Sequence, residues 1–137
     1  MLKVFLDTNI LIDLIADRKP FSKHAIEIFK SKEENKTHLY TSSHSIVTAH
    51  YLLKKYVDEK ELRTILFNLL DFIEVIPVDL DGLKKGLRSS IKDFEDAVQM
   101  QCASSIPGMN YLVTRNLKNF KTSEIEVLSP DELCLKL

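Results

Sequence analysis

The chain has 137 residues, 45% of them hydrophobic, which suits one globular domain with a single continuous core. Its 19 basic and 20 acidic side chains leave a formal net charge of −1, which excludes a protein that coats nucleic acid by general attraction but not an enzyme acting on RNA. No apolar run is long enough to cross a membrane, and an acid at position 7 comes too early for a signal peptide, so a cytoplasmic protein is predicted.

The N-terminal segment predicts a strand, an acidic turn and a helix. The run KVFL, residues 3–6, is apolar and rich in strand-forming residues, and the polar turn DTN beginning at Asp7 ends it. From Ile10 the apolar residues recur at helical spacing, with Asp13 and Asp17 on the opposite, polar face. Both of these acids are expected to be caps or surface charges.

The next part of the chain predicts a helix, a strand and two further helices. Ser22 is placed to cap the first helix, residues 38–40 form the strand, and residues 46–53 lie in the next helix. The last helix begins at Asp58, with Glu61 completing a capping box. The predicted apolar faces are Ala25, Ile26 and Phe29 in the first helix and Leu62, Ile65, Leu66, Leu69 and Ile73 in the last.

The C-terminal half alternates between the same two kinds of element. Strands are predicted at 74–78, 111–113 and 126–128, and helices at 79–88, at 94–102 and from Ser129 onward. Short apolar strands separated by helices indicate an α/β domain with a mostly parallel sheet of four to five strands. Ligands of such sheets bind at the carboxyl ends of the strands, which directs attention to the residues that follow each strand.

Acidic and polar side chains follow two of these strands. Asp7 comes directly after the first strand, Thr114 and Asn116 follow the fourth, and Asp93 and Asp96 begin the helix before it. These groups converge if the first and fourth strands are neighbours in the sheet. Oxygen ligands without histidine or thiolate suit Mg²⁺ or Mn²⁺, and such an ion can activate water against a phosphodiester.

Each acid also has a structural interpretation. Asp7 suits the N-cap of the first helix equally well, and Asp93 is favoured as the N-cap of its own helix. Asp96 lies on the apolar flank of that helix, where an acid without a partner is costly, so it is the better ligand candidate. Glu95 points to a different side of the helix and is predicted to be solvated.

The histidines and cysteines carry no catalytic pattern. His44 and His50 stand six residues apart, which is not one helical face, and no nucleophile motif accompanies them, so a structural or surface role is expected. Cys102 and Cys134 belong to no metal-binding or disulfide pattern and are predicted to be buried thiols.

Basic residues beside the strand ends are candidates for binding a phosphate backbone. Arg115 and Lys118 follow the fourth strand directly, next to the proposed acidic site. These two are therefore the predicted substrate-binding residues. Other lysines, such as Lys84 and Lys92, fit solvated helix faces as well as a phosphate-binding surface.

Four segments in this order resemble the PIN-domain family over essentially the whole chain: VFLDTNILIDLI, DFEDAVQMQCA, YLVTRNLKNF and VLSPDEL. Similar proteins include the VapC-type toxins of bacterial toxin–antitoxin pairs, which are Mg²⁺-dependent endoribonucleases with a three-layer α/β/α fold. The resemblance implies a single PIN domain over residues 1–137 with a central, mostly parallel sheet. It also implies an RNA substrate, a cognate antitoxin and a homodimer.

The same resemblance assigns roles to the site residues. It implies that Asp7 and Asp96 bind the metal, and that Asn116 stands where many relatives have Asp. Asp93 matches a metal-site acid of the subgroup with the DFEDA motif. The supporting positions of the two polar turns are Asn9 and Thr114.

One residue expected from the resemblance is absent. PIN nucleases usually place a Glu early on the helix after the second strand, and here Thr48, Ala49 and His50 occupy that place. No acid occurs between His38 and Val57. Because ligand charge is a main determinant of divalent binding, metal affinity is expected to be lower than in a typical site.

Two functions therefore remain open at this stage. The first is a Mg²⁺-dependent (or Mn²⁺-dependent) endoribonuclease with catalytic residues Asp7, Asp96 and Asn116, acting as the toxin of a type II toxin–antitoxin pair. The second is a PIN-like module that binds RNA or protein through a depleted, inactive metal site. Aspartyl phosphohydrolases and receiver domains are disfavoured, because Asn9 replaces the second acid of the former and Asp7 lacks the adjacent acid of the latter.

Overall fold

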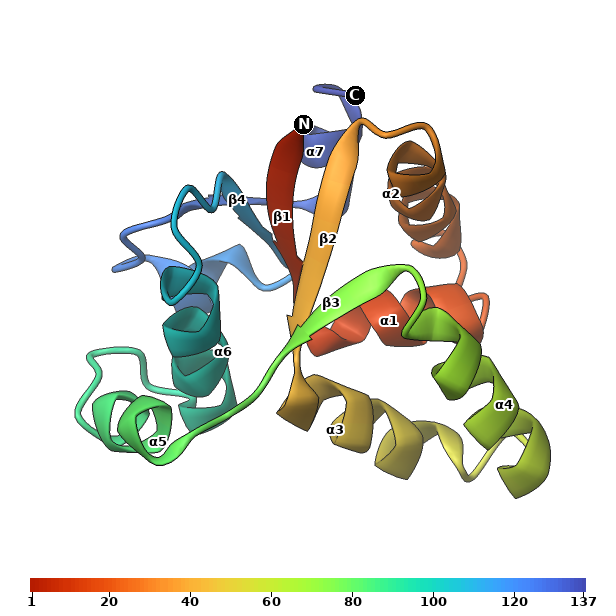
Figure 1. Cartoon of the computed structure of the whole chain (residues 1–137), viewed down its shortest axis with the longest axis horizontal. Coiled ribbons are helices and arrows are strands. Elements are labelled where there is room, and N and C mark those ends of the chain that lie inside the picture. The colour runs from red at the N-terminus through yellow and green to blue at the C-terminus, as the bar shows by residue number, and fades with distance from the viewer.

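All 137 residues are described by a computed structural model, shown in Figure 1. Its centre is a five-stranded sheet in the order β3-β2-β1-β4-β5, and every neighbouring pair is parallel. The strands are β1 (Leu2–Leu6), β2 (Thr37–Ser42), β3 (Ile73–Ile76), β4 (Tyr111–Val113) and β5 (Glu126–Leu128). The predicted α/β class and parallel sheet are confirmed.

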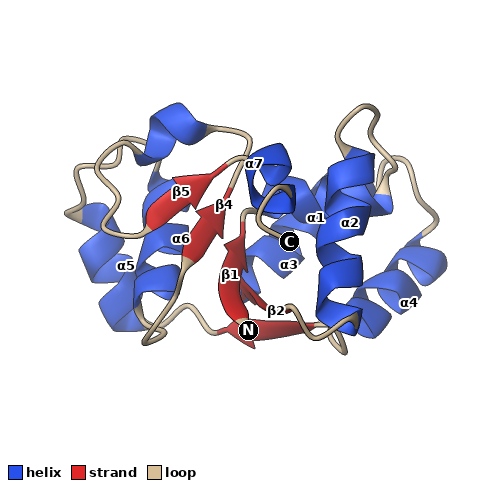
Figure 2. Cartoon of the chain, turned by 90° about the horizontal axis from the view of Figure 1, so that it is seen from above, coloured by secondary structure: helices blue, strands red, loops and turns tan.

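Helices cover both faces of this sheet. They are α1 (Thr8–Ile15), α2 (Ser22–Glu33), α3 (Ser43–Leu53), α4 (Glu59–Leu69), α5 (Leu80–Leu87), α6 (Phe94–Ser104), the short α7 (Pro130–Cys134) and the 3₁₀ turn η1 (Leu117–Phe120). Figures 1 and 2 show α1 to α4 on one side of the strands and α5 and α6 on the other. The three-layer α/β/α arrangement is therefore confirmed. No helix is long and apolar enough to span a membrane.

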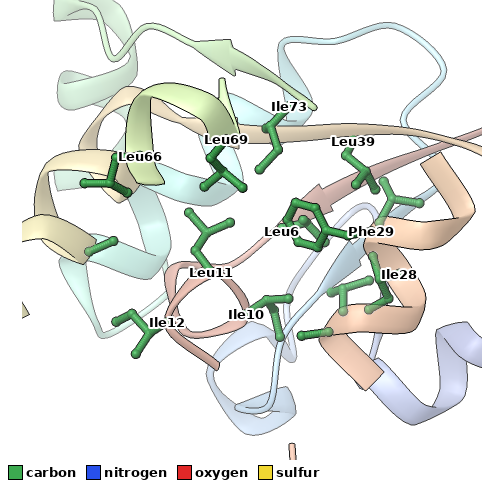
Figure 3. Close-up of a cluster of buried hydrophobic side chains, with 14 of the residues drawn as sticks. Leu6, Ile10, Leu11, Ile12, Ile28, Phe29, Leu39, Leu66, Leu69 and Ile73 are labelled. Atoms are coloured by element: carbon green, nitrogen blue, oxygen red, sulfur yellow. The ribbon is translucent and has the colours of Figure 1, made fainter. Parts of the chain in front are cut away.

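Alternation along the central strand divides the core in two. Val4 and Leu6 of β1 belong to a buried cluster shared with α1 to α4 and α7, whereas Phe5 between them belongs to a second cluster with α6. This is the period of two expected for a strand buried on both faces. Figure 3 shows the first cluster, in which Leu11 of α1 points toward Leu69 of α4 and Ile10 lies near Ile28 of α2.

The order of the strands creates a switch point beside β1. The chain runs from β1 to β2 and β3 on one side, and then returns to lay β4 and β5 on the other side. At such a point the loops after the two central strands diverge and leave a crevice at their carboxyl ends. Asp7 and Thr114 follow these two strands, so the predicted convergence of the first and fourth strands is correct.

Several local expectations are wrong. Ile73 begins β3 instead of extending the face of α4, and that strand ends at Ile76, before Pro77. Ser22 is the first residue of α2 and makes no capping bond, while Ile26 is 40% exposed because Ile28 occupies the inward position. Asp58 does cap α4 by accepting from the Glu61 N–H, without the reciprocal bond of a capping box.

Candidate active site

The carboxylate of Asp7 is held in place beneath the crevice. Asp7 occupies the N-cap position of α1, but its side chain makes no capping bond. Instead its Oδ1 accepts from the Gln99 amide at 2.9 Å, and its Oδ2 accepts from the Thr114 hydroxyl at 2.7 Å. Only 3% of the Asp7 surface is exposed. Of the two interpretations of Asp7, the geometry thus favours an oriented carboxylate over a cap.

A chain of buried hydrogen bonds extends from this carboxylate. The Thr8 hydroxyl donates to Ser45 at 2.9 Å, and the Ser45 hydroxyl donates to the Gln99 carbonyl oxygen at 3.4 Å. On the other side the Asn116 N–H donates to the Thr114 hydroxyl at 3.0 Å. We call Asp7 with Thr8, Ser45, Gln99 and Thr114 the floor of the site. It joins the ends of β1 and β4 to α1, α3 and α6.

Asp96 forms the other side of the crevice, in the first turn of α6. It is 7% exposed, and its Oδ2 accepts from the Asn119 amide at 2.8 Å, the one side-chain hydrogen bond it receives. Burial, together with repulsion from Asp7, Asp93 and Glu95, raises the pKa of Asp96 to about 6, against the opposing effect of the Asn119 hydrogen bond. We call Asp96 and Asn119 the rim of the site.

The remaining predicted site residues surround this pair at the surface. Asp93 is exposed and caps α6 by accepting from the Asp96 N–H, as its structural interpretation requires. Asn116 and Lys118 are exposed, and Asn9 is half-buried in the first turn of α1. The amide that reaches Asp96 is therefore that of Asn119, three residues beyond the predicted Asn116.

Asp13 is not a surface charge, contrary to the sequence-based expectation. It is 1% exposed and receives two hydrogen bonds from the Arg115 guanidinium, at 2.8 and 3.1 Å. The guanidinium carbon also lies 4.0 Å from the centre of the Phe21 ring. Burial raises the pKa of Asp13, while Arg115 acts in the opposite direction. Arg115, a predicted substrate-binding residue, thus already neutralises a buried acid.

No acid of α3 enters the site, in agreement with the absence noted in the sequence. At the N-terminal end of α3, Ser45 belongs to the floor. The neighbouring His44 ring faces Glu95 of α6, with 3.1 Å between Nε2 and Oε2. His44 also contacts the Thr48 hydroxyl at 3.1 Å. Glu95 is consequently half-buried and paired, where full solvation was predicted.

A basic hollow of about 280 Å³ opens beside the rim. Lys92, Lys118 and Lys121 line it together with Asp93 and Asn119, which places three cations next to the acid that caps α6. A surface of this kind attracts a phosphate backbone. Lys118, a predicted substrate-binding residue, lies in this hollow, and Lys121 is an additional basic residue that the sequence did not single out.

The donor set of the crevice fits a hard divalent cation. Asp7 and Asp96 supply carboxylate oxygens only, which Mg²⁺ and Mn²⁺ prefer over nitrogen or sulfur. The two carboxylates repel each other enough to contribute to the raised pKa of Asp96, and a cation between them would remove that repulsion. No group of three acidic, histidine or cysteine ligand atoms within 4.8 Å of one another includes either aspartate.

Three residues of the site escaped the sequence analysis. Gln99 and Asn119 supply the amides that hold the two acids, and Ser45 links Gln99 to Thr8. Gln99 stands three residues after Asp96 in the same helix, so a shared face was available as a signal. Neither Ser45 nor Asn119 carries a comparable signal, because each reaches the site only through tertiary packing, Ser45 from α3 and Asn119 from η1.

The sheet order, the switch-point crevice and the paired aspartates define an α/β protein with a candidate metal site at the carboxyl ends of parallel strands. The sequence profile of the PIN domain matches residues 3–118. The chain belongs to the PIN-domain family.

Known relatives lie among VapC proteins. Ribonuclease VapC1 of Aquifex aeolicus is 31% identical over 137 residues, which cover 96% of this chain and 93% of that protein. A toxin–antitoxin complex from Klebsiella pneumoniae contains a chain that superposes with a TM-score of 0.67 at 26% identity, covering 93% and 97% of the two chains. The DNA-bound VapBC structure from Salmonella typhimurium gives a TM-score of 0.70 at 21% identity, with 95% and 99% covered.

Proposed function

We propose that this protein is a metal-dependent endoribonuclease that hydrolyses RNA phosphodiester bonds, acting through a single PIN domain over residues 1–137. The observation that carries the proposal is the pair of buried aspartates, Asp7 and Asp96, at the switch point of the sheet. Similarity to Ribonuclease VapC1 over nearly the whole chain supports the same substrate class.

Asp7 and Asp96 are the residues that would hold Mg²⁺ or Mn²⁺, with Asp93 close by at the start of α6. Such an ion supplies an activated water and charge stabilisation at the phosphate. Gln99 and Thr114 fix the orientation of the Asp7 carboxylate, and Asn119 fixes that of Asp96. This preorganisation spares the site the cost of ordering its ligands when substrate binds.

The polar residues at the mouth of the crevice bind the substrate. Asn116 and Asn9 lie at the turns after β4 and β1, where their amides are available to the scissile phosphate or its attacking water. Lys118 and the other lysines of the basic hollow bind the flanking phosphates. Arg115 acts at the same edge through the part of its guanidinium not engaged by Asp13.

We further propose that the protein is the toxin of a toxin–antitoxin pair, with a cognate antitoxin as partner and a homodimer as its assembly. The Klebsiella pneumoniae relative, itself a toxin–antitoxin complex, supports this assignment. So does an apolar surface on α3 and α4, where Val47, Tyr51 and Phe67 are 67%, 57% and 73% exposed. Side chains of this kind are enriched at protein–protein interfaces.

A cleavage assay on single-stranded and structured RNA tests the enzymatic proposal. We expect cleavage with Mg²⁺ or Mn²⁺, none with a chelator, and a loss of at least about 100-fold in Asp7→Asn and Asp96→Asn, the scale of removing a charge-stabilising group. Asp81→Asn, an exposed acid of α5, is the matched control and should retain activity. Equal cleavage by all variants would identify a contaminating nuclease and overturn the proposal.

A second candidate function is supported by one observation, the lack of an acid on α3. A PIN-like module with this depleted site would bind RNA or protein without hydrolysing it. Anisotropy titration of a labelled RNA separates the two functions. Tight binding that neither metal ion converts to cleavage would favour the module, whereas metal-dependent products from the same RNA would exclude it.

A further inference from the structure

A mixed cluster of potential metal ligands lies between α2 and α7, apart from the Asp7 and Asp96 pair, and its His24 also lines a hollow with Arg115 and Asn116. His24, Glu27 and Cys134 each offer a ligand atom, and these atoms all lie within 4.8 Å of one another. His24 and Glu27 are three residues apart on one face of α2, and Cys134 is the last residue of α7. The cluster therefore joins two segments that are more than a hundred residues apart in the chain.

The histidine of this cluster lacks a partner. Its Nδ1 is the one buried side-chain nitrogen or oxygen in the chain that has no hydrogen bond. A buried polar atom in this state costs free energy, and native proteins rarely retain one without a reason. A cation in the cluster would give the His24 ring the partner that the protein alone does not provide.

Cys134 is only half-buried, contrary to the prediction of a core thiol, and its environment differs from that of Cys102. Burial, followed by the proximity of Glu27, raises the pKa of the Cys134 thiol to about 12. Without a metal the thiol is therefore protonated at neutral pH. Coordination deprotonates a thiol, so a metal that binds here releases a proton and binds more tightly as pH rises.

We propose that His24, Glu27 and Cys134 bind a zinc ion that fastens α7 to α2. Nitrogen, sulfur and carboxylate ligands together select zinc over magnesium, so this site is chemically distinct from the oxygen-only crevice of Asp7 and Asp96. Three protein ligands leave the fourth tetrahedral position to water. The site stabilises the packing of the C-terminal helix, and it does not depend on the nuclease proposal.

Titration of the metal-free full-length protein with Co²⁺, a spectroscopic substitute for Zn²⁺, tests this site. Excess Mg²⁺ and a non-thiol reductant are included, so that the carboxylate crevice is occupied and both cysteines stay reduced. We expect one equivalent to bind with a near-ultraviolet thiolate-to-cobalt band, to be displaced by Zn²⁺, and to bind more tightly at pH 8 than at pH 6.5. Zinc should also raise the thermal midpoint, because a ligand of the native state stabilises it.

Variants assign the ligands. Cys134→Ser should abolish the charge-transfer band, whereas Cys102→Ser, the matched control at the other cysteine, should retain it. His24→Gln should weaken zinc at least about tenfold, since even an outer-shell partner commonly contributes 10–100-fold. Metal-free unfolding curves show whether each variant folds. Absence of the band in wild type, or identical zinc affinity in folded Cys134→Ser, would mean that the thiol only donates to the His24 backbone carbonyl, 3.7 Å away, and the zinc site would be wrong.

Discussion

The floor and the rim of the crevice hold the same kind of side chain in different ways. Asp7 in the floor accepts two hydrogen bonds from buried donors, one on each oxygen. Asp96 in the rim is nearly as buried, yet it receives one side-chain hydrogen bond and has a pKa raised to about 6 by burial and by its acidic neighbours. The floor therefore positions its charge, whereas the rim retains a charge that the protein does not fully compensate.

A third buried acid, Asp13, has its negative charge fully paired with a cation of the protein. Asp13 is 1% exposed, and the Arg115 fork satisfies both of its oxygens. The protein is thus able to supply a cation to a buried carboxylate and does so in helix α1, six residues after Asp7. That no such side chain faces Asp96 is consistent with a cation supplied from solution.

The largest effect on stability is expected where compensation is complete. Arg115→Ala would leave Asp13 as a buried, unpaired acid, and breaking a buried pair in this way costs about 3–5 kcal/mol of unfolding free energy. Chemical denaturation measures it. The double variant Asp13→Asn/Arg115→Ala should recover part of the loss, because the stranded charge is then gone. A loss below about 1 kcal/mol for Arg115→Ala would show that the pair behaves like a surface salt bridge.

Removing the charge of Asp96 in the rim should raise the unfolding free energy, opposite to the effect of Arg115→Ala. A folded-state pKa of about 6 against an ordinary 3.8 means that the native state binds this proton more tightly than the unfolded state. Stability from this group is present at low pH and is lost as pH rises through about 6, by up to ~3 kcal/mol for a shift of roughly two units. Asp96→Asn should therefore stabilise the protein at pH 7.5 while abolishing cleavage.

The difference in stability between wild type and Asp96→Asn isolates this group from other titrating residues. It should shrink as the pH is lowered from 7.5 to 5, as measured by urea unfolding without divalent metal. Saturating Mg²⁺ should shrink it at pH 7.5 as well, because the ion removes the same repulsion. An unchanged difference across this pH range would refute the uncompensated rim.

The same aspartate-to-asparagine change in the floor, Asp7→Asn, should lower the stability of the protein. In Asp7→Asn one oxygen becomes an NH₂ group, which donates and does not accept. The substituted side chain would therefore accept from only one of the two present donors, the Thr114 hydroxyl and the Gln99 amide. An unsatisfied buried donor costs about 1–3 kcal/mol, so this variant should unfold at lower denaturant concentration than wild type. If Asp7→Asn and Asp96→Asn shift the unfolding midpoint in the same direction, the distinction between floor and rim fails.

The smallest effects are expected at the basic hollow outside the rim. Lys92→Gln, Lys118→Gln or Lys121→Gln should each weaken RNA binding modestly and reduce the slope of log affinity against log salt by ~0.7, the value for one contact to a single strand. Binding titrations at several salt concentrations give this slope. Lys60→Gln, an exposed lysine of α4, should leave it unchanged.

Patterns along the chain predicted the elements well, because the apolar periods of β1 and α4 are set by burial in a sheet or on a helix face. They placed Asp7 at the end of a strand and Asp96 at the start of a helix, because both boundaries are visible in sequence. Asp13 was misplaced because its apparent polar face turns inward to meet Arg115, about a hundred residues away. Ser45 and Asn119 depend likewise on tertiary packing, which local periodicity does not report.

The hydrogen bond from Thr114 to Asp7 spans 107 positions of the chain, and β4 pairs with β1 only after β2 and β3 have been made. A ribosome releases the chain from its N-terminus onward, so β1 emerges with Asp7 long before β4 is synthesised. The floor therefore assembles only after β4 has been synthesised. A nascent chain that has not yet reached β4 lacks the Thr114 hydroxyl that orients its first acid.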